Sequence, residues 1–167
     1  MNRSRIAIPA IAIMALVLAS TEARSEERSD SLMGVNLYEG ASAVFRRDGA
    51  SFDGVSLSQY VGVYRRVSRA GYIDLDFSAN LNLGDTLPGA WFGVHPDYRH
   101  FLAGPLYGTA GLDLFWNPKH VDAGAHAGLG VRFAVGRLSI GASVLGATTI
   151  DNDVFELRGT AGLAFAF

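Results

Sequence analysis

Residues 155–167, the last stretch of the chain, constrain the fold most. Their odd positions carry apolar residues or Gly, whereas their even positions begin with Glu156, Arg158 and Thr160 before turning small. This period of two predicts a β-strand with one apolar face and one polar or small face. Because the chain ends on Phe167 without a tail, we expect this strand to be paired, most simply with the first strand of the same chain.

The first 23 residues have the pattern of a secretory signal peptide. Arg3 and Arg5 give a basic start, residues 6–19 form a non-polar run, and residues 20–23 form a small, polar exit. The run is shorter than the roughly 20 apolar residues that a spanning helix needs, so an uncleaved anchor is the less favoured alternative. We therefore expect cleavage after Ala23, with Ser20 and Ser25 as alternative sites.

The composition of the full sequence limits the fold. A length of 167 residues suggests one domain, and a net charge of −2 is too small to indicate a nucleic-acid partner. The chain has no Cys, so packing and backbone hydrogen bonds must hold it together. Its 20 Gly residues sit inside alternating segments, which indicates crowded strands rather than a linker. We expect a flexible segment over residues 24–33 and a barrel over residues 34–167.

Eight segments after the polar amino-terminal stretch are long enough to cross a bilayer as tilted strands, which takes about 9 to 11 residues each. None of them shows an apolar stripe at helical spacing. Strands that cross lipid can satisfy all their backbone groups only by closing. The sequence therefore predicts an all-β fold, an eight-stranded antiparallel up-and-down transmembrane β-barrel. The predicted strands are residues 34–46, 55–67, 72–83, 90–102, 106–116, 121–136, 138–149 and 155–167.

The third segment shows its two faces most clearly. Ile73, Leu75 and Phe77 alternate with Asp74 and Asp76. A slip of one residue would move two carboxylates to the apolar side, so the register of this strand is well specified.

Other segments are less regular. In the first two, Glu39 and Gln59 fall among apolar neighbours, so the facing of these strands stays open. Pro96 cannot donate a ladder hydrogen bond, and we expect a local bulge there. Asp-Gly pairs predict a loop over residues 47–54. Tight turns are expected at 103–105 and 136–137.

Alternation alone does not separate a membrane barrel from a soluble lipocalin-like barrel, because only the direction of the apolar face differs. Three features favour lipid outside. The predicted inner face is charged, a signal peptide without a later spanning helix sends the chain beyond the inner membrane, and the aromatic residues sort by height into two girdles. The predicted girdle residues are Phe92, Trp116 and Phe155 toward the outer rim, and Tyr98, Phe133, Phe165 and Phe167 toward the inner rim.

An eight-stranded barrel has an interior just wide enough for its own side chains, so we expect a plugged lumen. Buried charges are costly unless paired, which predicts two stacked polar clusters. Asp74 and Asp76 would lie near Arg132 at the periplasmic end, with Arg65 or Arg66 and with Asp97 and Arg99. The outer cluster would hold Asp113, Asp122, His126, Glu156 and Arg158.

Two arrangements of residues could carry chemistry. His126 could act as a base with Ser139 or Ser143 as nucleophile, but a hydrogen-bonded lumen histidine is the favoured interpretation. His95 and His100 are five residues apart and so fall on opposite faces of a strand, which argues against a shared metal ion. We therefore expect no catalytic, metal or cofactor site.

An alternating last strand that ends on Phe167, in a chain of eight such segments, resembles the small eight-stranded outer-membrane proteins of the OmpA transmembrane-domain and OmpX kind. The resemblance implies a bacterial outer-membrane location and a Phe167 that is read by the barrel-insertion machinery. Expected partners are outer-membrane lipid, lipopolysaccharide and the secretion and insertion machinery, and we expect a monomer.

The leading functional hypothesis is a structural or surface-interaction barrel without enzymatic activity. One alternative is an outer-membrane lipid-modifying enzyme of the lipid-A acyl hydrolase type. Another is a soluble lipocalin-like ligand-binding barrel, which would need its apolar faces turned inward.

Overall fold

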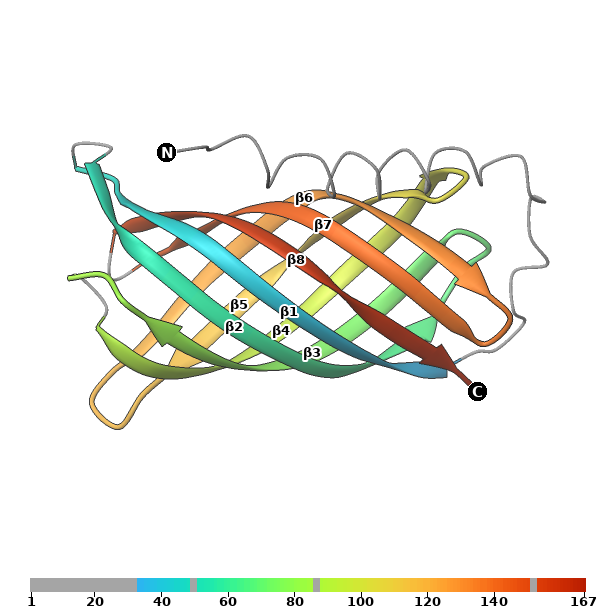
Figure 1. Ribbon diagram of the computed structural model, residues 1–167, viewed down its shortest axis with the longest axis horizontal. Helices are drawn as coiled ribbons and strands as arrows, with labels where there is room; N and C mark the ends of the chain where they lie inside the picture. Colours follow the sequence, from blue (N-terminus) through green and yellow to red (C-terminus); the bar gives the residue numbers. More distant parts are fainter. Residues whose placement is uncertain (1–32, 49–50, 86–87, 151–152) are drawn as a thin grey trace, which may run out of the picture.

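The computed structural model describes residues 33–48, 51–85, 88–150 and 153–167. Within these ranges each strand pairs antiparallel with the next, and the first pairs with the last, so the sheet closes into a barrel (Figure 1). The predicted all-β, eight-stranded antiparallel barrel is thereby confirmed. The strands are β1 (Met33–Arg46), β2 (Ser51–Arg66), β3 (Gly71–Asn82), β4 (Gly89–Ala103), β5 (Leu106–Trp116), β6 (Val121–Val135), β7 (Leu138–Thr149) and β8 (Val154–Ala166).

The barrel has two ends, which we name by their connections. The turn end holds the carboxyl terminus and the connections after β2, β4 and β6, and the loop end holds those after β1, β3, β5 and β7. The tight turns predicted at the turn end are present. Gly104 and Gly136 have φ angles of +51° and +62°, which favour Gly because a side chain is strained there.

The start of β2 corrects one prediction. The expected loop over residues 47–54 is shorter, because a register shift between Val44 and Phe45 lets pairing continue to Arg46 and Ser51. The Asp-Gly pair at residues 53–54 therefore lies inside β2 rather than in a turn. Gly54 is needed there for close packing, since a Cβ atom at this position would meet the backbone of Gly84.

The bulge predicted at Pro96 is wrong. Val94 pairs with Leu114 and Asp97 pairs with Gly111, so both strands advance by three residues and no residue is inserted. The ladder to β5 is instead interrupted at His95 and Pro96 without a change of register. Loss of the proline N–H donor removes a ladder bond but does not by itself shift a strand.

Burial fixes the facing of every strand, including the two left open. In β1 the side chains of Asn36 and Ser42 are buried, whereas Leu37 is 59% exposed. Odd-numbered residues of β1 and β2 therefore point outward, and Glu39 and Gln59 lie on the outer face. The predicted facing of β3 is confirmed, because its aspartates are buried and its Ile, Leu and Phe residues are exposed.

The predicted signal peptide over residues 1–23 lies outside the described residues, as does the predicted flexible segment except for Met33, which begins β1. Within the described ranges, no helix is long and apolar enough to cross a membrane.

Candidate functional site

The interior of the barrel gathers most of the polar side chains and is the candidate site. Period-two alternation sends every second residue of each strand inward. The structure places all eight predicted lumen residues on inward faces. Asp74, Asp76, Asp113, Asp122, His126, Glu156 and Arg158 are buried, and Arg132 is half-buried.

Asp113 of β5 is the centre of the largest cluster. Its Oδ1 atom accepts hydrogen bonds from Nδ1 of His95 at 2.5 Å and from Nδ1 of His126 at 3.0 Å. Arg158 approaches the same oxygen at 3.9 Å and forms an ion pair with Glu156 at 3.0 Å. Four strands thus converge on one buried carboxylate, which we call the central cluster.

The central cluster extends at both ends. Nε2 of His95 lies 2.7 Å from the hydroxyl of Ser78, which also accepts a hydrogen bond from the Asn80 amide at 2.8 Å. On the other side, Nε2 of His126 faces a carboxylate oxygen of Asp97 at 3.8 Å. Sequence reasoning placed neither His95 nor Ser78 in the network, although both lie on the inward face of their strands.

A second cluster lies nearer the turn end. Asp74 forms an ion pair with Arg99 at 3.3 Å and accepts a hydrogen bond from the Asn36 amide at 2.9 Å. The same amide reaches Asp76 at 3.4 Å. The guanidinium of Arg99 also lies 4.8 Å from the ring centre of Tyr107, a cation–π contact.

The structure differs from the predicted partners at two places. Arg132 does not join the aspartate cluster but stacks on Tyr64 at 4.6 Å and donates a hydrogen bond to Ser139 at 2.8 Å. Arg65 points outward because it follows the odd positions of β2, and Arg66 donates to backbone carbonyls of the next turn. Asp122 lies near the loop end and lines the same cavity as Glu156 and Arg158, with which it was predicted to group.

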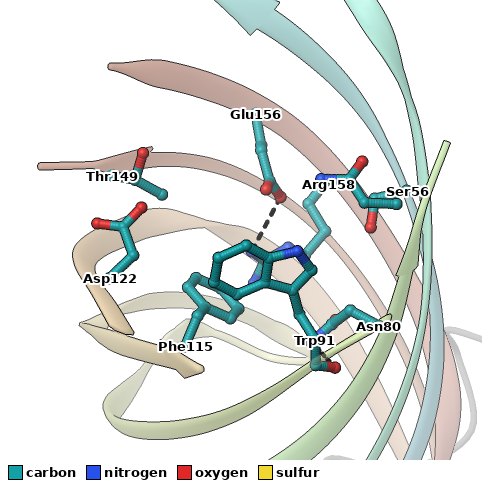
Figure 2. A pocket seen from close by; sticks show the side chains of 9 residues that line it. Ser56, Asn80, Trp91, Phe115, Asp122, Thr149, Glu156 and Arg158 are labelled. Atoms are coloured by element: carbon teal, nitrogen blue, oxygen red, sulfur yellow. Dashed lines mark hydrogen bonds and ion pairs between the residues drawn. The ribbon is translucent and has the colours of Figure 1, made fainter. Parts of the chain in front are cut away.

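An apolar cluster lies at the loop end of the interior. Val44, Trp91, Phe115 and Val154 come from four strands, and none is more than 9% exposed. Figure 2 shows Trp91 and Phe115 near Glu156 and Arg158, with Asp122 and Thr149 also lining the opening. Sequence reasoning put Phe115 on the inner face but did not single out this cluster, whose members are spread over the whole chain.

The packed interior leaves little space. One cavity of about 20 Å³ lies beside the apolar cluster, and another of about 40 Å³ lies among Tyr60, His95 and Arg99. A buried water needs about 10 to 15 Å³ by this kind of measure, so each cavity has room for a few water molecules at most.

The predicted girdle residues lie on the outer face. Phe92, Trp116, Phe155, Phe165, Phe167 and Tyr98 are exposed, and Phe133 is half-buried. At the loop end Phe92 packs on Trp116 with ring centres 6.2 Å apart. Phe45 and Phe52 also join this level and contact each other at 5.8 Å. Sequence reasoning missed Phe45 because the facing of its strand was open, and it missed Phe52 because this residue fell in the predicted loop over residues 47–54.

The catalytic pairs considered from sequence do not form. Ser143 lies 2.7 Å from Thr160, and Ser139 contacts Arg132, so neither serine contacts His126. His95 is buried and His100 is exposed, as their spacing predicted. Among the described residues, no group of three or more His, Cys, Asp or Glu is arranged to hold a metal ion.

The chain Ser78–His95–Asp113 nevertheless has the connectivity of a Ser-His-Asp triad. All three side chains are buried, and the adjoining cavity of about 40 Å³ holds only a few waters. A hydrolase needs room for a substrate carbonyl about 3 Å from the serine oxygen. The cavity beside these three residues is smaller than such a substrate group.

Comparison with solved structures identifies the class of fold. Neisserial surface protein A is similar to this chain with a TM-score of 0.58 and 11% identity, over 82% of this chain and 98% of that one. A structure from the de novo design of transmembrane β-barrels has a TM-score of 0.50 and 13% identity, over 80% and 95% of the two chains. The fold is that of outer-membrane β-barrels. No protein-family model matches the chain, and no curated protein matches it either.

We predict that Asp113→Ala lowers the free energy of unfolding by about 3 to 5 kcal/mol, because it leaves Arg158 and two histidines buried without their shared carboxylate. Denaturant unfolding in detergent micelles measures the effect. Asp48→Ala is the control, since Asp48 pairs with Arg46 at 3.6 Å on the exposed rim and should cost about 1 kcal/mol or less. Equal decreases in the free energy of unfolding in the two variants would contradict the role assigned to Asp113.

Proposed function

We propose that this protein is a small barrel of the bacterial outer membrane with a structural or surface-interaction role and no catalytic activity. One observation carries the proposal: the barrel is apolar outside and charged inside. In water this distribution would expose a continuous hydrophobic surface, whereas in lipid it satisfies both faces. A soluble lipocalin-like barrel would need the opposite arrangement.

The aromatic residues support the same placement. Phe92, Trp116 and Phe155 mark the loop end of the outer face, and Phe165 and Phe167 mark the turn end. Aromatic side chains favour the two membrane interfaces, where an apolar ring meets polar headgroups. We therefore propose a barrel of the OmpA transmembrane-domain and OmpX kind. The proposed partners are outer-membrane lipid, lipopolysaccharide, and the secretion and insertion machinery that would read Phe167.

We further propose that the lumen is plugged. The apolar cluster narrows the loop end, and the two polar clusters fill the interior below it. The two cavities described above, of about 20 and 40 Å³, are too small for a continuous water file or a solute. The interior therefore stabilises the barrel, and interactions with other molecules take place on its outer face or at its rims.

A lipid-modifying enzyme is the second candidate, and the Ser78–His95–Asp113 chain is the observation that favours it. It is the weaker candidate for two reasons. Ser78 is buried behind a cavity that holds only a few waters. Its hydroxyl also accepts a hydrogen bond from Asn80, which occupies one of its lone pairs.

The full chain, produced in a Gram-negative host and extracted in detergent, should run on a gel as a compact band when unheated and shift on boiling. A closed sheet resists unfolding by detergent because no strand edge is open. In planar bilayers the unheated protein should carry no steady current, with the boiled sample as control. Extraction without detergent as a folded monomer would contradict the membrane placement, and a stable conducting channel would contradict the plugged lumen.

A fluorophosphonate probe separates the two candidate functions. We predict that the folded protein is labelled no more than its Ser78→Ala variant and that it leaves lipid-A acylation unchanged, because the probe cannot reach the buried hydroxyl. Labelling that Ser78→Ala removes would overturn the proposal in favour of the enzyme.

A further inference from the structure

The outer face of β1, β2 and β3 carries a polar pair inside a hollow. The hollow has a volume of about 530 Å³, and its lining includes Glu39, Gln59, Ala79 and Phe92. These strands lie side by side in the wall of the barrel (Figure 1). Glu39 and Gln59 are direct cross-strand partners, and both are exposed. Neither side chain has a hydrogen bond or ion pair with another described residue.

The position of this pair along the barrel axis is unusual for polar groups on the outer face. Glu39 lies six residues after the start of β1 at Met33 and seven before its end at Arg46. At about 3.3 Å per residue and a tilt of about 40°, it lies about 15 Å along the barrel axis from one end of the strand and about 18 Å from the other. In an apolar band about 25 Å tall, the pair would therefore face the middle of the hydrocarbon layer. Lipid headgroups and interfacial water cannot satisfy groups at this depth, and acyl chains offer no hydrogen bonds.

The residues next to the pair on the outer face have small side chains. Glu39 is beside Ala161 of β8, Gln59 is beside Ala79 of β3, and the next outward pair on β1 and β8 is Ala41 with Gly159. Larger exposed residues, among them Leu37, Leu57 and Val61, stand around this area. Small residues let two membrane-embedded surfaces approach closely enough for polar side chains to meet.

We propose that this face is the contact surface between two copies of the chain, an inference that rests on the membrane placement proposed above. Two copies with the same orientation in a membrane are related by a two-fold axis along the membrane normal. That operation preserves height and exchanges left and right. It therefore sets Glu39 of one copy opposite Gln59 of the other, and the reverse.

This pairing is chemically self-complementary. The Gln59 amide has N–H donors, and the Glu39 carboxylate has acceptor oxygens, so the two-fold creates two equivalent charge-assisted hydrogen bonds. Both would form in a dry environment, where an unpaired carboxylate is most costly. A second copy presents Gln59 and Glu39 at the same depth in the membrane as the pair on the first copy. The proposal therefore replaces the monomer expected from sequence with a dimer.

Cross-linking of the full chain, reconstituted in lipid vesicles, tests the inference. The protein has no Cys, so Ala41→Cys introduces a single thiol beside the polar pair. Ala127→Cys is the matched control, because Ala127 is an exposed alanine of β6, which does not adjoin β1, β2 or β3. A short bifunctional thiol reagent should give a species of twice the chain mass with Ala41→Cys and not with Ala127→Cys.

Second substitutions on the Ala41→Cys background test the pair itself. Glu39→Leu or Gln59→Leu should reduce the cross-linked fraction about tenfold, since each removes both symmetric hydrogen bonds. Glu39→Gln should retain it, because an amide can also accept from Gln59. The unboiled gel band of each variant should stay compact, as these residues lie outside the lumen networks.

The outcomes separate this inference from the proposed function. Equal cross-linking at residues 41 and 127, with compact unboiled bands, would overturn the dimer and leave the membrane barrel intact. The same cross-linking in native outer membranes tests which molecule covers this face. A cross-linked species whose mass is not twice that of the chain would show that the face contacts another protein and would overturn the dimer. Loss of the compact band in the parent protein would overturn the membrane placement and the dimer together.

Discussion

Closure of the sheet by the pairing of β1 with β8 is the constraint on which the rest of the structure depends. The ladder runs without interruption from Gly34 with Ala166 to Arg46 with Val154. A closed sheet pairs its backbone groups internally and leaves no strand edge, which is the condition for crossing lipid as β-structure. Closing with eight strands also fixes a narrow interior. Whatever points inward must therefore fit both in volume and in charge.

Glycine residues and charged side chains together fill the narrow interior. A Cβ atom at Gly62 would meet the carboxylate of Asp76, and one at Gly93 would lie 2.5 Å from His95 Nε2. At Gly111 it would lie 2.8 Å from the His126 ring. The glycines thus make room for the buried ionic side chains, and those side chains fill the space with hydrogen-bonded contacts. Removing one side chain from such a network leaves a buried charge without its partner. The stability of the barrel therefore depends on every charged side chain of the network being present.

Sequence alternation predicted the architecture, the facing of β3 and the inward position of all eight lumen residues, because a period of two is a local property of each strand. It also grouped Asp113, His126, Glu156 and Arg158, which meet in the structure, but it did not predict every partner. Partners across a barrel depend on strand tilt and stagger, which alternation does not encode. Of the arginines expected beside Asp74, Arg99 pairs with it, whereas Arg132 contacts Tyr64 and Ser139. Glu39 broke the pattern of β1, and only the burial of the alternate residues of this strand shows that Glu39 lies on the outer face.

The most direct test of the inside-out barrel is quenching of single-Cys fluorescent labels along β3 by lipids with brominated acyl chains. The chain has no native Cys, so Leu75→Cys, Phe77→Cys and Ser78→Cys need no further changes. We predict strong quenching at positions 75 and 77, which are exposed in the structure, and little quenching at the buried position 78. Equal quenching at all three positions, or quenching confined to position 78, would contradict the inside-out barrel.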